Sequence, residues 1–258
     1  MSNFISVQYD QHIYTISIDR PNAKNALNID MYTTLANILI EANNDDSVRA
    51  ILLTHTTEVF CSGNDMHDFL HMSQGTLNNS DSRQQVERFM VALLNCRKPI
   101  VAAVNGAAIG IGTTLLQYCD FVFCSPHTRF QTPFTPLGLC PEFASSIQLE
   151  KIIGTRKAKA MLMMGEPMMA SEAESLGFVN QVVDRPFNKA QTYVKQLASL
   201  PPNAMRNTKA LLNASSIEPL LACIELENQL LFDLLAQPEA KEAISAFLEK
   251  RAPDFSQF

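Results

Sequence analysis

A glycine-rich turn between two apolar segments constrains this chain more than any other feature. Residues 98–124 read KPIVAAVNGAAIGIGTTLLQYCDFVFC, so a β-branched, apolar run is followed by Gly106, Gly110 and Gly112. A helix is predicted over 113–118, and a second buried strand after it. Glycine lets a backbone bend sharply and approach a ligand, and the amides at a helix N-terminus suit an anion or a developing oxyanion. The stretch is equally typical of such a site and of an ordinary strand–turn–helix connection.

The same turn partly matches the dinucleotide-binding fingerprint GxGxxG, because Gly110-Ile111-Gly112 follows a strand and opens a helix. Leu115 stands where the third glycine belongs. Thr132 and its neighbours, about 20 residues further on, offer no acid for a ribose hydroxyl. The sequence therefore argues against a nicotinamide cofactor.

Composition indicates a globular protein with one large core. The chain has 258 residues, of which 47% are hydrophobic and 18% charged, and its formal net charge is -6. It contains no cluster of six or more Lys and Arg, which argues against a nucleic-acid partner, and no apolar run of about 20 residues that could span a membrane. Neither a secretory signal nor a peroxisomal address is evident, so we expect a cytoplasmic protein, of bacterial type.

Six cysteines are present without a CxxC pair, and most lie in apolar stretches. Buried free thiols in a reducing compartment are the expected state.

Strands and helices alternate up to about residue 185, which predicts an α/β layer structure, and the remainder is wholly helical. An apolar stripe within 220–235 is expected to cover the chain's own core or to pack on another subunit. We expect a polar mobile loop at 73–82 and irregular backbone at 126–141. Strands are predicted at 5–9, 13–19, 49–54 and 178–183, and helices at 29–43 (capped by Asn28), 83–95, 143–153, 155–164, 171–176 (capped by Ser171), 188–200, 202–214, 219–236 and 238–250.

Three segments, taken together and in order, resemble the crotonase (enoyl-CoA hydratase/isomerase) superfamily. They are RPNAKNALN at 20–28, FCSGND at 60–65, and NGAAIG at 105–110 with Cys119-Asp120. The resemblance runs nearly the whole chain. It implies an α/β fold with a crotonase-type ββα spiral core at 1–195 and a helical C-terminal oligomerisation region at 196–258, assembled as a homotrimer or a dimer of trimers.

A later segment narrows the resemblance to the Δ3,Δ2-enoyl-CoA isomerase branch, both the peroxisomal type and its bacterial relatives. Residues 132–138 and 141–146 match that branch, and Glu142 falls where it keeps its single catalytic glutamate. Thr114 and Phe134 occupy the positions of the two hydratase glutamates, which argues against simple water addition. Phe143-Ala144 departs from the small residues usual there, so the chain-length preference stays open.

The resemblance places the backbone N–H groups of Asn64 and Ile111 at the oxygen of a thioester enolate, an oxyanion hole that needs no polar side chain. Glu142 would move the proton, first as base and then as acid. Its apolar neighbours are expected to raise its pKa by disfavouring the charged form. The alternative is that Glu142 merely caps the helix expected from residue 143.

No cofactor is expected, because coenzyme A is part of the substrate, and no metal is required. His67 and His71 stand four apart on an expected helix, but neither an HExxH pattern nor a third ligand is evident. Lys24 would meet a phosphate of coenzyme A or remain a solvated surface lysine. The resemblance implies that the acyl-CoA contacts come from Lys24, Ala26, Leu27, Ser62, Gly63, Asp65, Met66, Gly110 and Phe134.

The expected function is therefore isomerisation of a cis- or trans-3-enoyl-CoA to the trans-2-enoyl-CoA in fatty-acid β-oxidation. Two alternatives stay open. One is another crotonase reaction, such as enoyl-CoA hydration or a related acyl-CoA isomerisation. The other is a non-catalytic member of the family that only binds acyl-CoA.

Overall fold

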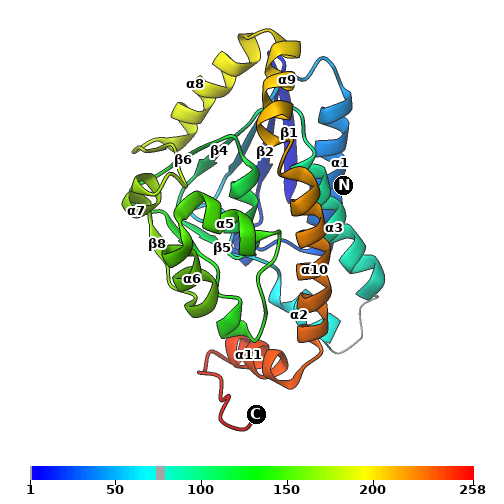
Figure 1. Ribbon diagram of the computed structural model, residues 1–258, viewed down its shortest axis with the longest axis vertical. Coiled ribbons are helices and arrows are strands. Elements are labelled where there is room, and N and C mark those ends of the chain that lie inside the picture. Colours follow the sequence, from blue (N-terminus) through cyan, green and yellow to red (C-terminus); the bar gives the residue numbers. More distant parts are fainter. Residues whose placement is uncertain (1, 74–78) are drawn as a thin grey trace.

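A six-stranded sheet forms the centre of the molecule, in a computed structural model that describes residues 2–73 and 79–258 (Figure 1). The strand order is β1-β2-β3-β4-β6-β9; β1 and β2 form an antiparallel hairpin and the other neighbours run parallel. The predicted N-terminal hairpin is thereby confirmed. The strands are β1 (Ile5–Asp10), β2 (Ile13–Ile18), β3 (Ala50–His55), β4 (Ile100–Val104), β6 (Phe121–Cys124) and β9 (Gln181–Val182).

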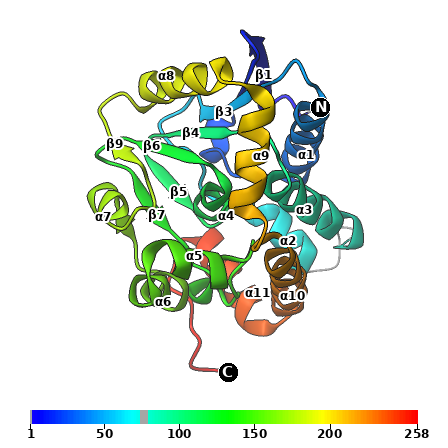
Figure 2. The same ribbon diagram turned by 45° about the horizontal axis from the view of Figure 1, so that its top comes forward.

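Helices cover both faces of this sheet, which is why its central strands read as continuous apolar runs. On one face α8 (Pro186–Ser199) packs over side chains such as Leu52. On the other face, residues such as Ile51 join the main core with α1 (Ile29–Asn44) and α3 (Asn79–Leu94), as Figure 2 shows. α1 begins as predicted, because the Asn28 side chain accepts a hydrogen bond from the amide of Met31.

A second, smaller sheet carries the glycine-rich turn. It has the order β5-β7-β8, from β5 (Ala107–Ile109), β7 (Arg129–Gln131) and β8 (Met168–Met169). The turn leads from β5 into α4 (Ile111–Thr114) and the 3-10 turn η2 (Leu115–Tyr118). The predicted helix at 113–118 thus starts two residues early, at Ile111.

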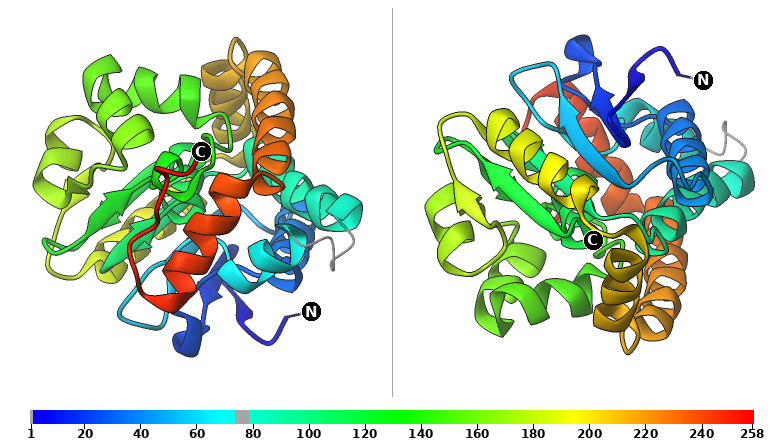
Figure 3. Two further views of the ribbon diagram at one scale, coloured as in Figure 1. Left: turned by 90° about the horizontal axis from the view of Figure 1, so that it is seen from below. Right: turned by 90° about the horizontal axis from the view of Figure 1, so that it is seen from above.

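The C-terminal helices fold back on their own chain. The apolar stripe of α10 buries Leu220, Ile224, Leu231 and Leu235 in the main core, while Leu230 stays exposed. α11 packs on α2 and on the 3-10 turn η3, and Figure 3 shows it crossing the underside of the molecule. The remaining elements are η1 (Pro21–Ala23), α2 (Met66–Ser73), η3 (Thr135–Leu137), α5 (Ser145–Ile153), α6 (Thr155–Met164), α7 (Ala170–Ser175), α9 (Pro202–Asn213), α10 (Ile217–Leu235) and α11 (Pro238–Glu249).

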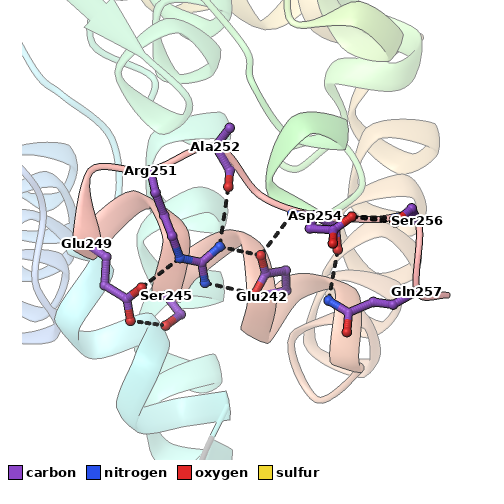
Figure 4. Close-up of polar contacts among 8 residues, drawn as sticks. All are labelled: Glu242, Ser245, Glu249, Arg251, Ala252, Asp254, Ser256 and Gln257. Carbon is purple, nitrogen blue, oxygen red and sulfur yellow. Dashed lines mark hydrogen bonds and ion pairs between the residues drawn. The ribbon is translucent and has the colours of Figure 1, made fainter.

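The last residues are tied to α11 by a polar cluster centred on Arg251 (Figure 4). Its guanidinium donates to both carboxylate oxygens of Glu242, at 2.5 and 2.9 Å, and to Glu249 at 2.7 Å. The amide of Asp254 donates to Glu242 as well. These bonds hold the C-terminal tail along the outer side of α11.

Several predicted elements need correction. Residues 126–141 are not wholly irregular, because they contain β7 and η3, and the strand predicted at 178–183 is confined to Gln181–Val182. Ser171 lies inside α7 rather than at its N-cap. Of the loop predicted at 73–82, residues 74–78 lie outside the described residues, whereas Ser73 ends α2 and α3 begins at Asn79. The polar residues from Asn79 onward therefore belong to α3, an amphipathic helix that packs on α1.

All six cysteines are free thiols, as expected. Within residues 2–73 and 79–258, no helix is long and apolar enough to cross a membrane.

Candidate active site

Two loops distant in the sequence are joined by backbone hydrogen bonds. The amide of Cys61 donates to Ala107 at 3.1 Å, and that of Ile109 donates back to Cys61 at 2.9 Å. A Cβ at Gly112 would lie 2.7 Å from the Cys61 carbonyl oxygen, closer than real contacts allow. Gly112 is therefore required for the close approach of the two loops, and the loops meet edge to edge.

Two backbone amide groups follow glycine turns in these loops. Gly63, with φ +105°, and Gly110, with φ +54°, turn the backbone immediately before Asn64 and Ile111. In the described part of the chain, the N–H groups of Asn64 and Ile111 donate to no backbone carbonyl. Ile111 is the first residue of α4, whose N–H has no partner within the helix in any case. Both N–H groups therefore remain available as donors to a bound oxygen.

The segment from Arg20 to Asn28 is bound to the first of these loops. The amide of Leu27 donates to Gly63, and the amide of Asp65 donates to Leu27, both at 2.9 Å. Arg20 adds an ion pair at 2.6 Å to the Asp65 carboxylate. Although burial alone would raise the pKa of Asp65, the Arg20 guanidinium holds it below its usual range. Three chain segments thus form one rigid surface.

Glu142 lies in the cavity that these loops border. Glu142 is only 2% exposed. Its Oε2 atom accepts a hydrogen bond of 3.3 Å from the side-chain Nδ2 atom of Asn64. Burial raises the pKa of Glu142 to about 8, since the bond from Asn64 offsets only part of the lost solvation. The cavity is lined by Ser62, Asn64, Met66, Phe69, Gly110, Pro133, Phe134, Leu137, Leu139, Glu142 and Leu231. A protonated carboxyl in this setting can release and accept a proton near neutral pH.

The Asn64 side chain is oriented by a residue of α1. The hydroxyl of Tyr32 donates to Asn64 Oδ1, and burial raises the pKa of Tyr32 well above its usual value, so it stays a donor. Asn64 Oδ1 is then an acceptor, which leaves the Nδ2 atom to face Glu142. The Asn64 backbone N–H thus remains an available donor, while the Asn64 side chain donates to Glu142.

Comparison with known proteins agrees with this geometry. The family model described as Enoyl-CoA hydratase/isomerase matches residues 8–258. The chain belongs to the enoyl-CoA hydratase/isomerase family. The predicted crotonase fold is also confirmed, since a crystal structure of an enoyl-CoA hydratase/isomerase from Pseudoalteromonas atlantica T6c superposes with a TM-score of 0.91, at 38% identity, over 98% of this chain and 100% of that one.

Relatives within the enoyl-CoA hydratase/isomerase family have different reactions. Human "Enoyl-CoA delta isomerase 2" is 34% identical over 95% of this chain, and the chain spans 63% of that protein's length. The "2,3-dehydroadipyl-CoA hydratase" of Escherichia coli (strain K12) is also 34% identical, over 99% of both chains. Identity alone therefore does not choose between isomerase and hydratase.

The residues expected to contact acyl-CoA fall into three groups. Ser62, Met66, Gly110 and Phe134 line the cavity beside Glu142. Gly63 does not line it, but its positive φ turns the backbone immediately before Asn64. Ala26, Leu27 and Asp65 are buried, and the Asp65 side chain is held by Arg20 rather than pointed at the cavity. Lys24 is exposed beside them, in a left-handed conformation with φ +49°.

Local structure bears on two alternatives raised by the sequence. Glu142 does not cap α5: the helix begins at Ser145, and its N-cap is Ala144 without a side-chain hydrogen bond. His67 and His71 both lie exposed on α2. In residues 2–73 and 79–258, no three His, Cys, Asp or Glu side chains lie close enough together to hold a metal ion.

Sequence motifs missed several residues of the site. Tyr32 lies mid-helix, where helical periodicity predicts only a core side chain, and Leu231 comes from the far C-terminal helix α10. Phe69 was assigned to no site, although it follows the first loop closely. A family motif identifies residues within a short segment. It does not show which distant helix packs against that segment to close the cavity.

Proposed function

We propose that this chain is a Δ3,Δ2-enoyl-CoA isomerase, which converts a 3-enoyl-CoA to the trans-2-enoyl-CoA and so serves the breakdown of unsaturated fatty acids. One observation carries the proposal: Glu142 is the single carboxylate among the described residues of a cavity that is also lined by Asn64 and by Gly110, the residue before the Ile111 amide. The raised pKa of Glu142, about 8, suits a group that must take a proton and then return it.

The proposed reaction has two proton transfers. The Glu142 carboxylate removes a proton from C2, the electrons move to the thioester oxygen, and the N–H groups of Asn64 and Ile111 stabilise the resulting enolate. The enolate electrons then return, the double bond moves from C3–C4 to C2–C3, and protonated Glu142 delivers the proton to C4. A backbone donor to such an oxyanion contributes about 3–4 kcal/mol to the transition state.

Hydration is the second candidate, because a full-length relative carries a hydratase name. Addition of water needs groups that activate the water and protonate C2. At the positions where the resemblance places the hydratase glutamates, this chain has Thr114 and Phe134, both buried. Neither can exchange a proton usefully, so the isomerase is the better-supported reaction.

We further propose that the segment from Lys24 to Leu27 and the loop from Ser62 to Met66 hold the coenzyme A moiety. Support comes from their backbone hydrogen bonds to each other beside the cavity: the amide of Ser62 donates to Lys24 at 3.1 Å. Exposed Lys24 would then meet a phosphate group.

The test uses purified protein with trans-3-hexenoyl-CoA, and follows the absorbance of the conjugated 2-enoyl thioester. Glu142→Gln should lower the rate by at least about 100-fold, the usual contribution of a positioned acid–base group, and should retain acyl-CoA binding. Glu166→Gln is the matched control, because Glu166 is exposed and far along the chain from the cavity.

A parallel assay with a 2-enoyl-CoA separates the rival reactions. Loss of the conjugated absorbance, with no activity on the 3-enoyl-CoA, would replace the isomerase by a hydratase. Binding without turnover of either substrate would leave a non-catalytic acyl-CoA-binding protein.

A further inference from the structure

A second buried carboxylate, Glu227 of α10, lies behind the segment that carries Glu142. It is 5% exposed, and it belongs to none of the motifs that carry the family resemblance. Its Oε1 atom accepts a hydrogen bond of 3.0 Å from the amide of Ser146, in the first turn of α5, and one of 3.5 Å from the Cys223 thiol. Its Oε2 atom has no hydrogen-bond partner among the described residues.

The turn between the two carboxylates is strained. Phe143 and Ala144 follow Glu142 with φ of +60° and +53°, a left-handed pair without glycine. Such conformations persist only where the surroundings hold them. The Tyr118 hydroxyl donates to the Phe143 carbonyl at 2.6 Å, and the two rings stack with centroids 4.3 Å apart.

Beyond the strained pair, the chain enters α5 through its bond to Glu227. The amide of Ser145 donates to the Glu142 carbonyl at 3.1 Å, and the next amide, that of Ser146, donates to Glu227. The free amides at a helix N-terminus favour a negative charge at this place. Glu227 is therefore fixed in space relative to the backbone that presents Glu142.

Among the described residues, several thiols and phenols also lie around this pair. They come from the first glycine loop, α1, η2, the segment before Glu142, and α10 itself. Burial raises the pKa of every one of them: Cys61, Tyr32, Tyr118, Cys140 and Cys223. Glu227 is the carboxyl neighbour that acts on Glu142, because a negative charge on Glu227 raises the pKa of Glu142.

Of the two carboxyls, Glu227 has more hydrogen bonds that favour the charged form. Burial raises the pKa of Glu227 too, but the Ser146 side chain and amide, the Cys223 thiol and the Ala144 backbone all favour its charged form. Among the described residues, the side chain of Glu142 accepts one hydrogen bond, from the side-chain Nδ2 atom of Asn64 at 3.3 Å. Where the two groups titrate as a pair, these hydrogen bonds favour the negative charge on Glu227 over Glu142.

We propose that Glu227 is a positioning residue for the reaction at Glu142: it anchors the left-handed turn that presents the Glu142 carboxyl and places a second buried carboxyl behind it. This inference rests on the proposed function, in which Glu142 moves the proton. A carboxyl held protonated up to higher pH is a stronger base once ionised, which favours removal of the weakly acidic C2 proton.

The first test is the pH dependence of kcat/KM for 3-hexenoyl-CoA, which reports the free enzyme. Glu227→Gln keeps an oxygen for the Ser146 amide but removes the charge. We expect its rising limb to move to lower pH by about one unit, because a like charge has been removed. Glu225→Gln is the matched control, since Glu225 lies exposed on the same helix and should leave the limb in place.

Rescue by a conservative change separates charge from packing. Glu227→Asp retains the charge, so its limb should return toward that of the wild type, whereas a merely structural role would lower thermal stability in Glu227→Gln without moving the limb. An unmoved limb in a folded Glu227→Gln variant would overturn the inference.

A second measurement does not depend on turnover. Carbon-13 NMR of protein labelled at glutamate carboxyls gives the Glu142 titration directly, with Glu142→Gln identifying its signal. A downward shift in Glu227→Gln supports the inference even if no 3-enoyl-CoA is converted, in which case the proposed function alone has failed. An unshifted Glu142 signal overturns the inference even if the isomerase assay succeeds.

Discussion

Glu142 acquires its chemistry from what surrounds it rather than from its own type. A glutamate in water ionises near pH 4.5, whereas burial moves the pKa of Glu142 to about 8. A single hydrogen bond, from the side-chain Nδ2 atom of Asn64 at 3.3 Å, does not replace the lost hydration. The Glu142 Oε1 atom is also buried, and it has no hydrogen-bond partner within residues 2–73 and 79–258. This residue is therefore poised for proton transfer at a cost in stability.

That cost predicts a pH-dependent effect of Glu142→Gln on stability. The unfolded side chain ionises near 4.5 and the folded one near 8, so the wild type loses stability as pH rises through this window. The variant lacks this loss. In urea unfolding, its stability relative to wild type should therefore increase from pH 5 to pH 8. Equal differences at both pH values, as expected for the exposed control Glu166→Gln, would contradict a burial-raised pKa.

Gly112 carries a second prediction at this scale. A methyl group there would meet the Cys61 carbonyl oxygen at 2.7 Å and the Cys61 Cβ atom at 2.8 Å. We expect Gly112→Ala to cost about 1–3 kcal/mol by overpacking, and to reduce kcat by displacing the neighbouring Ile111 amide. Gly177→Ala is the control. Its positive φ strains an alanine, but the added methyl group meets no atom within 4 Å, so kcat should be unchanged. Full activity in Gly112→Ala would argue against the oxyanion role of Ile111.

At the scale of elements, the site is an assembly of short connections rather than of long helices or strands. The η1 segment, the loop before α2 and the turn after β5 each contribute backbone groups, and isolated bridges between Leu27 and Asn64 and between Cys61 and Ala108 join them. Such short pairings are weak individually. The Arg20–Asp65 ion pair, with both side chains mostly buried, fastens the first two segments together.

Removal of this ion pair should weaken the assembly. Arg20→Met leaves the Asp65 carboxylate largely buried without its cation, and we expect a loss of about 1–3 kcal/mol at pH 7, less than for a fully buried pair. Because Arg20 helps to hold the pKa of Asp65 low, the loss should shrink as Asp65 protonates at acid pH. Urea unfolding at pH 7 and pH 3 measures both effects. Arg156→Met, an exposed change on α6, should have little effect, and a loss independent of pH would contradict the ionic origin.

At the scale of the whole molecule, the C-terminal helices close the site from within the same chain. α11 packs on α2 and η3, the elements that carry the apolar side of the cavity, and α10 supplies Leu231 and Glu227. The helices nevertheless leave large apolar side chains in contact with solvent. Leu211 and Leu212 on α9 are 78% and 76% exposed, a pattern that favours a subunit interface.

The family resemblance implies a trimer or a dimer of trimers, so we expect the protein to sediment at three or six times the chain mass of 28.7 kDa. The double variant Leu211→Lys, Leu212→Lys should dissociate it, because charges buried without partners oppose association. Val7→Lys on the edge strand β1 is the control and should leave the assembly intact. A monomeric wild type in analytical ultracentrifugation would contradict the predicted oligomer.

The sequence by itself determined the type of most elements and the family of the chain. Apolar periodicity, the Asn28 cap and the glycine turns are local signals, so the N-terminal hairpin, α1 and α6 could be predicted nearly to the residue. A family motif also singled out Glu142, which lines the cavity, whereas its catalytic role stays a prediction.

Only the tertiary structure decided what surrounds that glutamate. Tyr32 orients Asn64 and Glu227 anchors the turn, yet each looks from sequence like an ordinary residue on a helix. The left-handed pair at Phe143 and Ala144 was missed because local propensity favours a helix there, whereas contacts from η2 and α10 impose the turn. The physical reason is that burial and charge at a site depend on segments brought together by packing, and no local pattern records which segments those are.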